Sequence, residues 1–216
     1  MLPKYNKNRW SNKYGYYYIV PKKFLDVLTD FGIPPGKVLL VKDKEKLHFD
    51  HLYVSSLPGS EGRSPQWAIK YIRDKLIKTP TPAKPTKKIY LKRGNGTDRK
   101  LLNEDSIISA LKNYGFEIID TGNLSIYEQV SLVQQAKIIV SVHGAALTNL
   151  LFSPDNLMVV ELFSSDYFRT DCYYTLSAML KLNYWYIVGE KPARANWGDI
   201  VVDEKLLLRT IQQANE

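Results

Sequence analysis

Two polar segments of the 216-residue sequence carry side chains suited to holding an anion. The first is Leu91–Arg99, read Leu-Lys-Arg-Gly-Asn-Gly-Thr-Asp-Arg, which follows an apolar run and holds Arg93, Arg99 and two glycines. Guanidinium groups bind phosphate oxygens in bidentate fashion, and glycines let backbone N–H groups approach the same anion. The segment therefore suggests a phosphate-binding loop, although an exposed loop whose arginines contact only water fits it as well.

The second segment, His143-Gly144-Ala145-Ala146, follows the most apolar run of the chain. Its small residues allow a sharp turn into a helix, and N–H groups at the start of a helix bind anions. His143 could donate a hydrogen bond to a phosphate or cap a carbonyl group in a purely structural role. The residue types leave both interpretations open.

The elements that must position these segments alternate between strands and helices after residue 88. Helices are predicted over 171–180 and after the capping residues Asn103, Ser125 and Asp203. This alternation predicts a parallel sheet in a Rossmann-like α/β domain, whose ligand crevice lies at the carboxyl ends of the strands. Apolar runs predict the strands at 89–92, 116–120, 138–142, 157–162 and 184–188.

A proline-rich segment, Lys78–Lys88, precedes this region and predicts a stiff, extended linker. The predicted domains are a partial N-terminal α/β region (1–79), the linker (80–88), the Rossmann-like domain (89–190) and a C-terminal tail with a helix (191–216). Within the N-terminal region the pattern predicts strands at 16–20, 38–41 and 47–54, a helix from Pro21 to Phe31 stopped by Gly32, and a helix opened by Ser64-Pro65.

The charge of the chain is divided unevenly. Residues 1–100 hold 22 Lys/Arg against 8 Asp/Glu, and residues 101–216 hold 8 against 14. A basic half suits an anionic partner such as nucleic acid, a lipid surface, a phosphorylated ligand or an acidic glycan, but a solvated lysine-rich surface explains it equally. Nucleic acid is not expected, because the basic residues are not grouped with aromatic ones on one strand.

Several classes of protein and site are excluded or disfavoured. No apolar run reaches the ~18 residues of a membrane span, and the N-terminus does not read as a signal peptide, so we expect a cytoplasmic protein with peripheral membrane contact through its basic half. A single cysteine, Cys172, excludes an intrachain disulfide and a Cys-based metal cluster. The chain also has no Asp-x-Asp motif, so neither a metal nor another cofactor is expected.

A series of short motifs resembles glycosyltransferase family 61, which is also known as a domain of unknown function in capsular polysaccharide biosynthesis proteins. The resemblance runs from about Lys87 to Val188, whereas before the linker only the element order and the phrase Gly32-Ile-Pro-Pro fit. The motifs are, in chain order, Arg93, Arg99, Asn103-Glu104, Gly115-Phe116, Glu128-Gln129, His143-Gly-Ala-Ala-Leu-Thr-Asn149-Leu-Leu-Phe152 and Val160-Glu161-Leu162.

The resemblance implies a GT-B architecture, in which two Rossmann-like domains hold the nucleotide sugar mainly through the C-terminal one. It implies metal-independent, inverting transfer from a nucleotide sugar, expected to be UDP-linked, to a glycan or polysaccharide acceptor. By the same resemblance the diphosphate is neutralised by Arg93 and Arg99, with His143 and the amides of Gly144 and Ala145 at its other side. His143 is then the candidate to stabilise the leaving group.

The remaining motif residues receive secondary roles. Glu161 would accept hydrogen bonds from the nucleoside hydroxyls, or be an ordinary strand-end carboxylate. Thr148 and Asn149 would cap or line the pocket. Asn103, Glu128 and Gln129 are expected to cap helices and fix loops.

No general base for the acceptor hydroxyl is identified, because no motif marks Asp43, Asp50 or His51. We expect the chain to lack part of the N-terminal, acceptor-side domain and to self-associate through the exposed edge of its incomplete sheet. A naturally small enzyme is the alternative. A non-catalytic fragment that binds a nucleotide sugar or a glycan is a second functional interpretation.

Overall fold

The computed structural model describes residues 18–19, 22–39, 56–59, 63–93, 99–169 and 171–213. The chain divides into two compact units, residues 1–57 and 58–216, which are described separately.

In the first unit, a strand and a 3-10 helix stopped by Gly32, whose φ is +78°, agree with the sequence pattern. The strand expected at 47–54 and the candidate bases Asp43, Asp50 and His51 lie outside the described residues. The elements are β1 (Tyr18–Ile19), η2 (Lys22–Phe31), η3 (Pro35–Lys37) and β2 (Val38–Leu39), with β1 and β2 paired in parallel.

The second unit contains the parallel sheet that the apolar runs predict. Its five strands run in the order β4-β3-β5-β6-β7, so the chain moves to one side of β3 first and then to the other. This order confirms a Rossmann-like α/β fold and creates a topological switch point between β3 and β5. The strands are β3 (Lys87–Lys92), β4 (Phe116–Asp120), β5 (Ala136–Val142), β6 (Met158–Ser164) and β7 (Asn183–Gly189).

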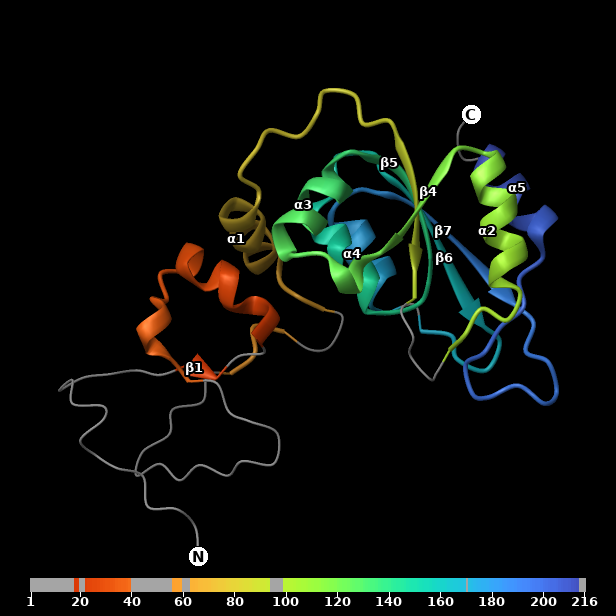
Figure 1. Cartoon of the computed structure of the whole chain (residues 1–216), viewed down its shortest axis with the longest axis horizontal. Coiled ribbons are helices and arrows are strands. Elements are labelled where there is room, and N and C mark those ends of the chain that lie inside the picture. Colours follow the sequence, from red (N-terminus) through yellow and green to blue (C-terminus); the bar gives the residue numbers. More distant parts are fainter. Residues whose placement is uncertain are drawn as a thin grey trace, which may run out of the picture. The chain divides into compact units, whose positions relative to one another are not determined.

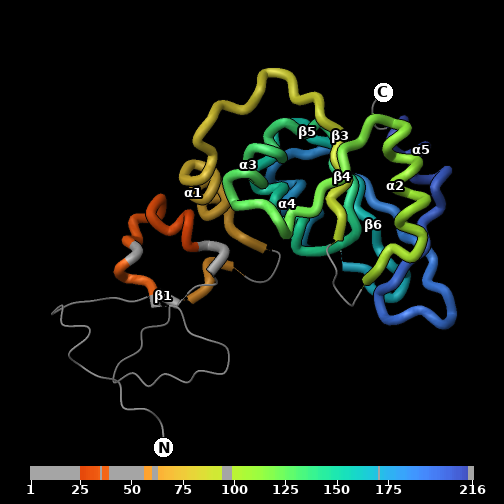
Figure 2. Tube along the Cα trace, in the orientation of Figure 1, coloured from red at the N-terminus to blue at the C-terminus, as the bar shows by residue number. Residues whose placement is uncertain are grey.

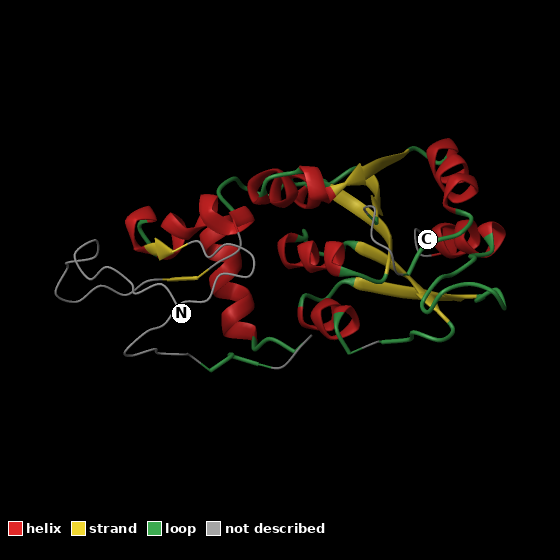
Figure 3. Ribbon diagram, turned by 60° about the horizontal axis from the view of Figure 1, so that its bottom comes forward, coloured by secondary structure: helices red, strands yellow, loops and turns green. Residues whose placement is uncertain are grey.

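Helices cover both faces of this sheet (Figures 1 and 3). Helices α2 and α5 lie on one face, and α3, η5 and α4 lie on the other. The central strands β5 and β6 are buried almost throughout, which explains why they read as continuous apolar runs. The helices are α1 (Gln66–Leu76), α2 (Glu104–Asn113), η4 (Thr121–Asn123), α3 (Ile126–Gln134), η5 (Ala145–Phe152), α4 (Tyr173–Met179) and α5 (Glu204–Gln213).

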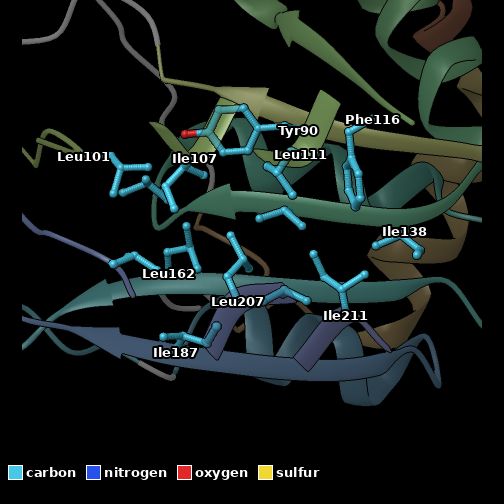
Figure 4. Close-up of a cluster of buried hydrophobic side chains, with 14 of the residues drawn as sticks. Tyr90, Leu101, Ile107, Leu111, Phe116, Ile138, Leu162, Ile187, Leu207 and Ile211 are labelled. Carbon is cyan, nitrogen blue, oxygen red and sulfur yellow. The ribbon is translucent and has the colours of Figure 1, made fainter. Parts of the chain in front are cut away.

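The main hydrophobic core lies between the sheet and the pair α2 and α5 (Figure 4). Ile107 and Leu111 of α2 and Leu207 and Ile211 of α5 pack against alternate residues of the strands. Tyr90 is the largest of the fully buried side chains in this unit, and its hydroxyl donates to Glu104 Oε1 at 2.9 Å. This core fixes the strands, and therefore the edge at which their carboxyl ends meet.

Two of the three predicted helix caps are confirmed. Ser125 and Glu128 form a reciprocal capping box, with Ser125 N to Glu128 Oε2 at 2.7 Å, and hydrogen bonds from Ser125 lower the pKa of Glu128. Asp203 Oδ1 accepts from Lys205 N at 2.8 Å at the start of α5.

Asn103 precedes α2, but the prediction that it caps this helix is wrong. Its side chain makes no cap bond and instead pairs with both backbone groups of Val202, at 2.8 and 3.1 Å. An amide carries both a donor and an acceptor, so it can bind the two groups of an extended residue brought close by the fold.

The segment after His143 forms a 3-10 helix, η5, where the small residues suggested a helix without fixing its type. Helix α1 is joined to the end of η5 because Arg73 donates to the carbonyl oxygens of Leu151 at 2.5 Å and Ser153 at 3.2 Å. The path from α1 to β3 has no helix or strand between residues 77 and 86 (Figure 2). The compact units separate before α1, at Leu57 and Pro58, and the domain boundaries at residues 80–88 stay a prediction.

Across the described ranges, none of the helices combines the length and the apolar character that a membrane crossing requires.

Replacing Ser125 by Ala should lower the free energy of unfolding by about 1 kcal/mol, because the first turn of α3 loses the side-chain acceptor of its capping box. Urea unfolding followed by circular dichroism measures the change. Ser131→Ala, an exposed serine within the same helix, is the matched control and should be close to neutral. Equal unfolding midpoints for Ser125→Ala and Ser131→Ala would contradict the capping role.

Candidate functional site

Arg93 and His143 meet at the switch point of the sheet. Arg93 directly follows β3 and His143 directly follows β5, and these two strands are paired neighbours. Arg93 Nη1 donates to the backbone oxygen of His143 at 3.0 Å. Through this bond the guanidinium group of Arg93, from the first segment that the sequence singled out, contacts the start of the second segment at the carboxyl edge.

Gly144 allows this approach. Its φ of 168° is extended backbone that any residue adopts, so the backbone conformation does not require glycine. A Cβ atom at this position, however, would lie 2.5 Å from Arg93 Nη1. The absence of a side chain is therefore what lets the guanidinium group rest against the turn.

The ring of His143 is held by a hydrogen bond and by three aromatic rings. Nδ1 lies 2.5 Å from Glu161 Oε1, and the residue is only 5% exposed. The ring stacks on Phe163 with centroids 5.1 Å apart, while Tyr167 and Tyr173 each lie 5.4 Å away at steeper angles. These contacts fix the plane of the imidazole and the direction of both nitrogens.

Glu161 is completely buried on β6. One carboxylate oxygen faces His143 and the other accepts from the hydroxyl of Tyr184 at 2.6 Å. Burial and the neighbouring Glu161 both raise the pKa of Tyr184, so this hydroxyl stays protonated and acts as a donor. The carboxylate is thus enclosed by protein groups, and its contact with nucleoside hydroxyls stays a prediction.

Arg99 also contacts one of the aromatic residues around His143. Its guanidinium carbon lies 5.0 Å from the centre of the Tyr167 ring, and its Nε is buried without a hydrogen-bond partner in the described part of the chain. Arg99 has a φ of +59°, and its side chain packs on Gly198, where a Cβ atom would collide with it. Trp197 packs edge-on against Tyr167 at 4.5 Å. The residues between the two arginines, 94–98, are outside the described ranges.

The start of η5 contains Ala145 and Thr148, whose side chains are both exposed. Thr148 Oγ1 lies 3.5 Å from the hydroxyl of Tyr173, whose pKa is raised mainly by burial. Thr148 and Tyr173 line a cavity of about 170 Å³ together with Cys172 and residues of α1 and α4. A larger hollow of about 580 Å³ between α1 and α4 shares Ile69 and Met179 with it.

Asn149 is buried and connects elements instead of facing this cavity. Its Nδ2 donates to Gln129 Oε1 at 2.8 Å and to the backbone oxygen of Ala146 at 3.0 Å. Gln129 in turn donates to the carbonyl oxygens of Thr121 and Leu124. This network joins α3 to η5, so Gln129 fixes a loop as expected. Contact of Asn149 with the nucleotide-sugar donor stays a prediction.

Sequence reasoning missed most of the aromatic residues of the site. Tyr167, Tyr173 and Tyr184 surround His143 and Glu161, but 15 tyrosines occur in the chain and no local pattern distinguishes these three. Gly198 could have been found as the turn residue of an Asn-Trp-Gly-Asp stretch. Its contact with Arg99 depends on the tertiary fold and has no sequence signal.

Replacing Asn149 by Ala should lower the free energy of unfolding by about 1 kcal/mol, because the half-buried side-chain oxygen of Gln129 loses its donor. Thermal and urea unfolding measure the loss. Asn113→Ala, at the exposed end of α2, is the control and should change little. If both variants unfold alike, the network does not support η5.

The sequence of the chain was compared with protein families and with known proteins, and it matches a family of glycosyltransferases. The family model described as "Glycosyltransferase 61" matches residues 2–160, and thus includes Arg93, Arg99, His143 and Gly144. The EGF domain-specific O-linked N-acetylglucosamine transferase of Mus musculus is 33% identical over 101 residues, which are 44% of this chain and 18% of the relative.

Two further relatives give similar figures. The transferase of the same name from Xenopus laevis is 34% identical over 91 residues, covering 40% of this chain and 17% of the relative. The beta-1,2-xylosyltransferase XAX1 of Oryza sativa subsp. japonica is 32% identical over 98 residues, covering 43% and 17%. The chain thus matches less than a fifth of the length of each of these relatives. Because the family model covers well over half of the chain, the protein belongs to glycosyltransferase family 61.

Proposed function

We propose that this chain takes part in transferring a sugar from a nucleoside-diphosphate donor, expected to be UDP-linked, to a glycan acceptor. The donor diphosphate would bind at the carboxyl edge between β3 and β5, in contact with Arg93, Arg99, His143 and the amides of Gly144 and Ala145. The observation that carries the proposal is the contact of Arg93 with the His143 backbone at the switch point.

The position of this contact supports the assignment. In open parallel sheets, ligands bind outside the carboxyl ends of the strands, where the chain order reverses. Arg93 and His143 leave the two strands on either side of that point. A guanidinium group and a turn rich in small residues at such a place favour an anionic ligand.

The chemistry of transfer needs such an arrangement. The acceptor oxygen attacks the anomeric carbon, the bond from that carbon to the diphosphate oxygen breaks, and negative charge collects on the departing nucleoside diphosphate. Fixed positive groups stabilise this charge without reorganising at the moment of reaction. Attack from the face opposite the leaving group would invert the anomeric centre, and the acceptor proton would pass to a base that is not identified here.

The sugar is left open, so UDP without a sugar is the probe. The names of the relatives specify N-acetylglucosamine for one protein and xylose for another, so the sugar differs among proteins similar to this chain. A non-catalytic fragment that binds a nucleotide sugar or a glycan is the alternative, and sugar transfer to a mixed acceptor pool distinguishes it from an enzyme. Membrane contact and self-association stay predictions.

UDP should bind without an added divalent metal ion, because the arginines and η5 amides supply the positive charge. Isothermal titration with UDP in the presence and absence of EDTA measures this. Equal affinities are expected in the two titrations. A complete loss of binding in EDTA would contradict the proposal.

Replacing Arg93 by Ala should weaken UDP binding by about 1.5–3 kcal/mol, the usual value of a hydrogen bond to a charged group. Arg209→Ala removes the same side chain from an exposed position on α5 and should leave the affinity unchanged. If Arg93→Ala binds UDP as well as Arg209→Ala does, the diphosphate site lies elsewhere.

A further inference from the structure

Glu161 has a carboxylate that the proposed chemistry does not use directly. It is 0% exposed, and each of its oxygens already has a partner, His143 Nδ1 at 2.5 Å and the Tyr184 hydroxyl at 2.6 Å. A buried carboxylate without partners would be strongly unfavourable, so these two contacts are what allow Glu161 to be there. We propose that Glu161, held by Tyr184, is a positioning residue that orients His143 toward the donor diphosphate, an inference that rests on the function proposed above.

The register of the sheet brings the three side chains to one face. Glu161 is paired with Ser141 of β5, and the backbone N–H of His143 donates to Leu162 at 2.9 Å, which extends the ladder beyond the end of β5. Glu161 is also paired with Tyr186, two residues after Tyr184 on β7. Because side chains alternate along a strand, His143, Glu161 and Tyr184 project to the same side. Glu161 and Tyr184 lie on neighbouring strands of the sheet, and His143 directly follows a third strand.

The contact at Nδ1 determines what the other nitrogen can do. A carboxylate beside Nδ1 keeps a proton there, which fixes the orientation of the ring. A diphosphate oxygen only accepts hydrogen bonds, so Nε2 contributes to donor binding in the imidazolium form, in which both ring nitrogens carry a proton. Nε2 lies across the ring from Glu161 and has no hydrogen bond within the described part of the chain. Nε2 therefore points away from the buried carboxylate, and the proposal assigns it to the donor diphosphate.

Glu161→Gln keeps the shape of the side chain and removes its charge, so its effect separates two roles. UDP and inorganic pyrophosphate are the two probes, since pyrophosphate has no nucleoside. If Glu161 acts through His143, the affinities for both probes should fall by the same factor, about tenfold, as for one hydrogen bond to a charged group. A loss for UDP with unchanged pyrophosphate binding would instead mean that Glu161 holds the nucleoside hydroxyls, and would overturn the proposal.

A double-mutant cycle with His143→Ala tests the dependence directly. Once the imidazole is gone, Glu161→Gln should cause no further loss of affinity for either probe. Losses that add in the double variant would show that Glu161 acts independently of His143, which would also overturn the proposal.

Tyr184→Phe is the second variant, in case Glu161→Gln does not fold. Loss of the hydroxyl removes one donor from Glu161 and should weaken binding of both probes by a smaller, equal factor of about threefold. Tyr186→Phe is the matched control on the same strand and the same face, where the side chain is 51% exposed, and it should have no effect. Equal affinities for Tyr184→Phe and Tyr186→Phe would contradict the proposal that the Tyr184 hydroxyl holds Glu161 in position.

Nitrogen-15 NMR of the histidine rings needs no ligand and therefore separates this proposal from the proposed function. The chain has three histidines, so comparison with His143→Ala identifies the signal of His143. The Nδ1 of His143 should be protonated in the wild type, and the ring signals should shift in Glu161→Gln. An unprotonated Nδ1, or a spectrum unchanged by Glu161→Gln, would overturn the positioning role. A wild type that binds neither probe but shows the expected NMR behaviour would overturn the function alone.

Discussion

The completely buried carboxylate of Glu161 must have hydrogen-bond partners, and this requirement determines which side chains lie together at the carboxyl edge. Glu161 can lie inside the sheet only because His143 and Tyr184 face it from the strands on either side. The hydrogen bond to Glu161 fixes the imidazole of His143 at the end of β5. Tyr167 and Tyr173 then pack against this ring. The polar contact and the aromatic packing therefore stabilise the same orientation.

His143 is held at three chemically different points. Its amide donates to Leu162, its ring contacts Glu161, and its carbonyl oxygen accepts from Arg93. The first two contacts lead to β6, and the third leads to the residue that directly follows β3. A movement of this residue would break bonds on both sides of the switch point, so the start of η5 has little freedom to shift.

The local parts of this arrangement could be predicted from the sequence. The capping box of Ser125 and Glu128 spans one turn, and the apolar runs of β5 and β6 reflect burial on both faces, so neighbouring residues carry the whole signal. Asn103 was misassigned because its partner, Val202, is 99 residues away. The enclosure of Glu161 was missed for the same reason, since register between strands, and not spacing along one strand, determines that Tyr184 reaches it.

Glycine illustrates how the physical reason can differ from the one that a pattern suggests. The sequence indicates Gly144 as a residue for a sharp turn, yet its backbone is extended and its role is to admit Arg93. Gly198 admits Arg99 in the same way, and it also requires a positive φ, of +78°. A side chain at either position would displace a guanidinium group from the carboxyl edge. Both glycines thus hold two guanidinium groups in place through packing alone. A ligand that meets groups already ordered loses less free energy on binding, so this packing would favour the anionic donor proposed for the site.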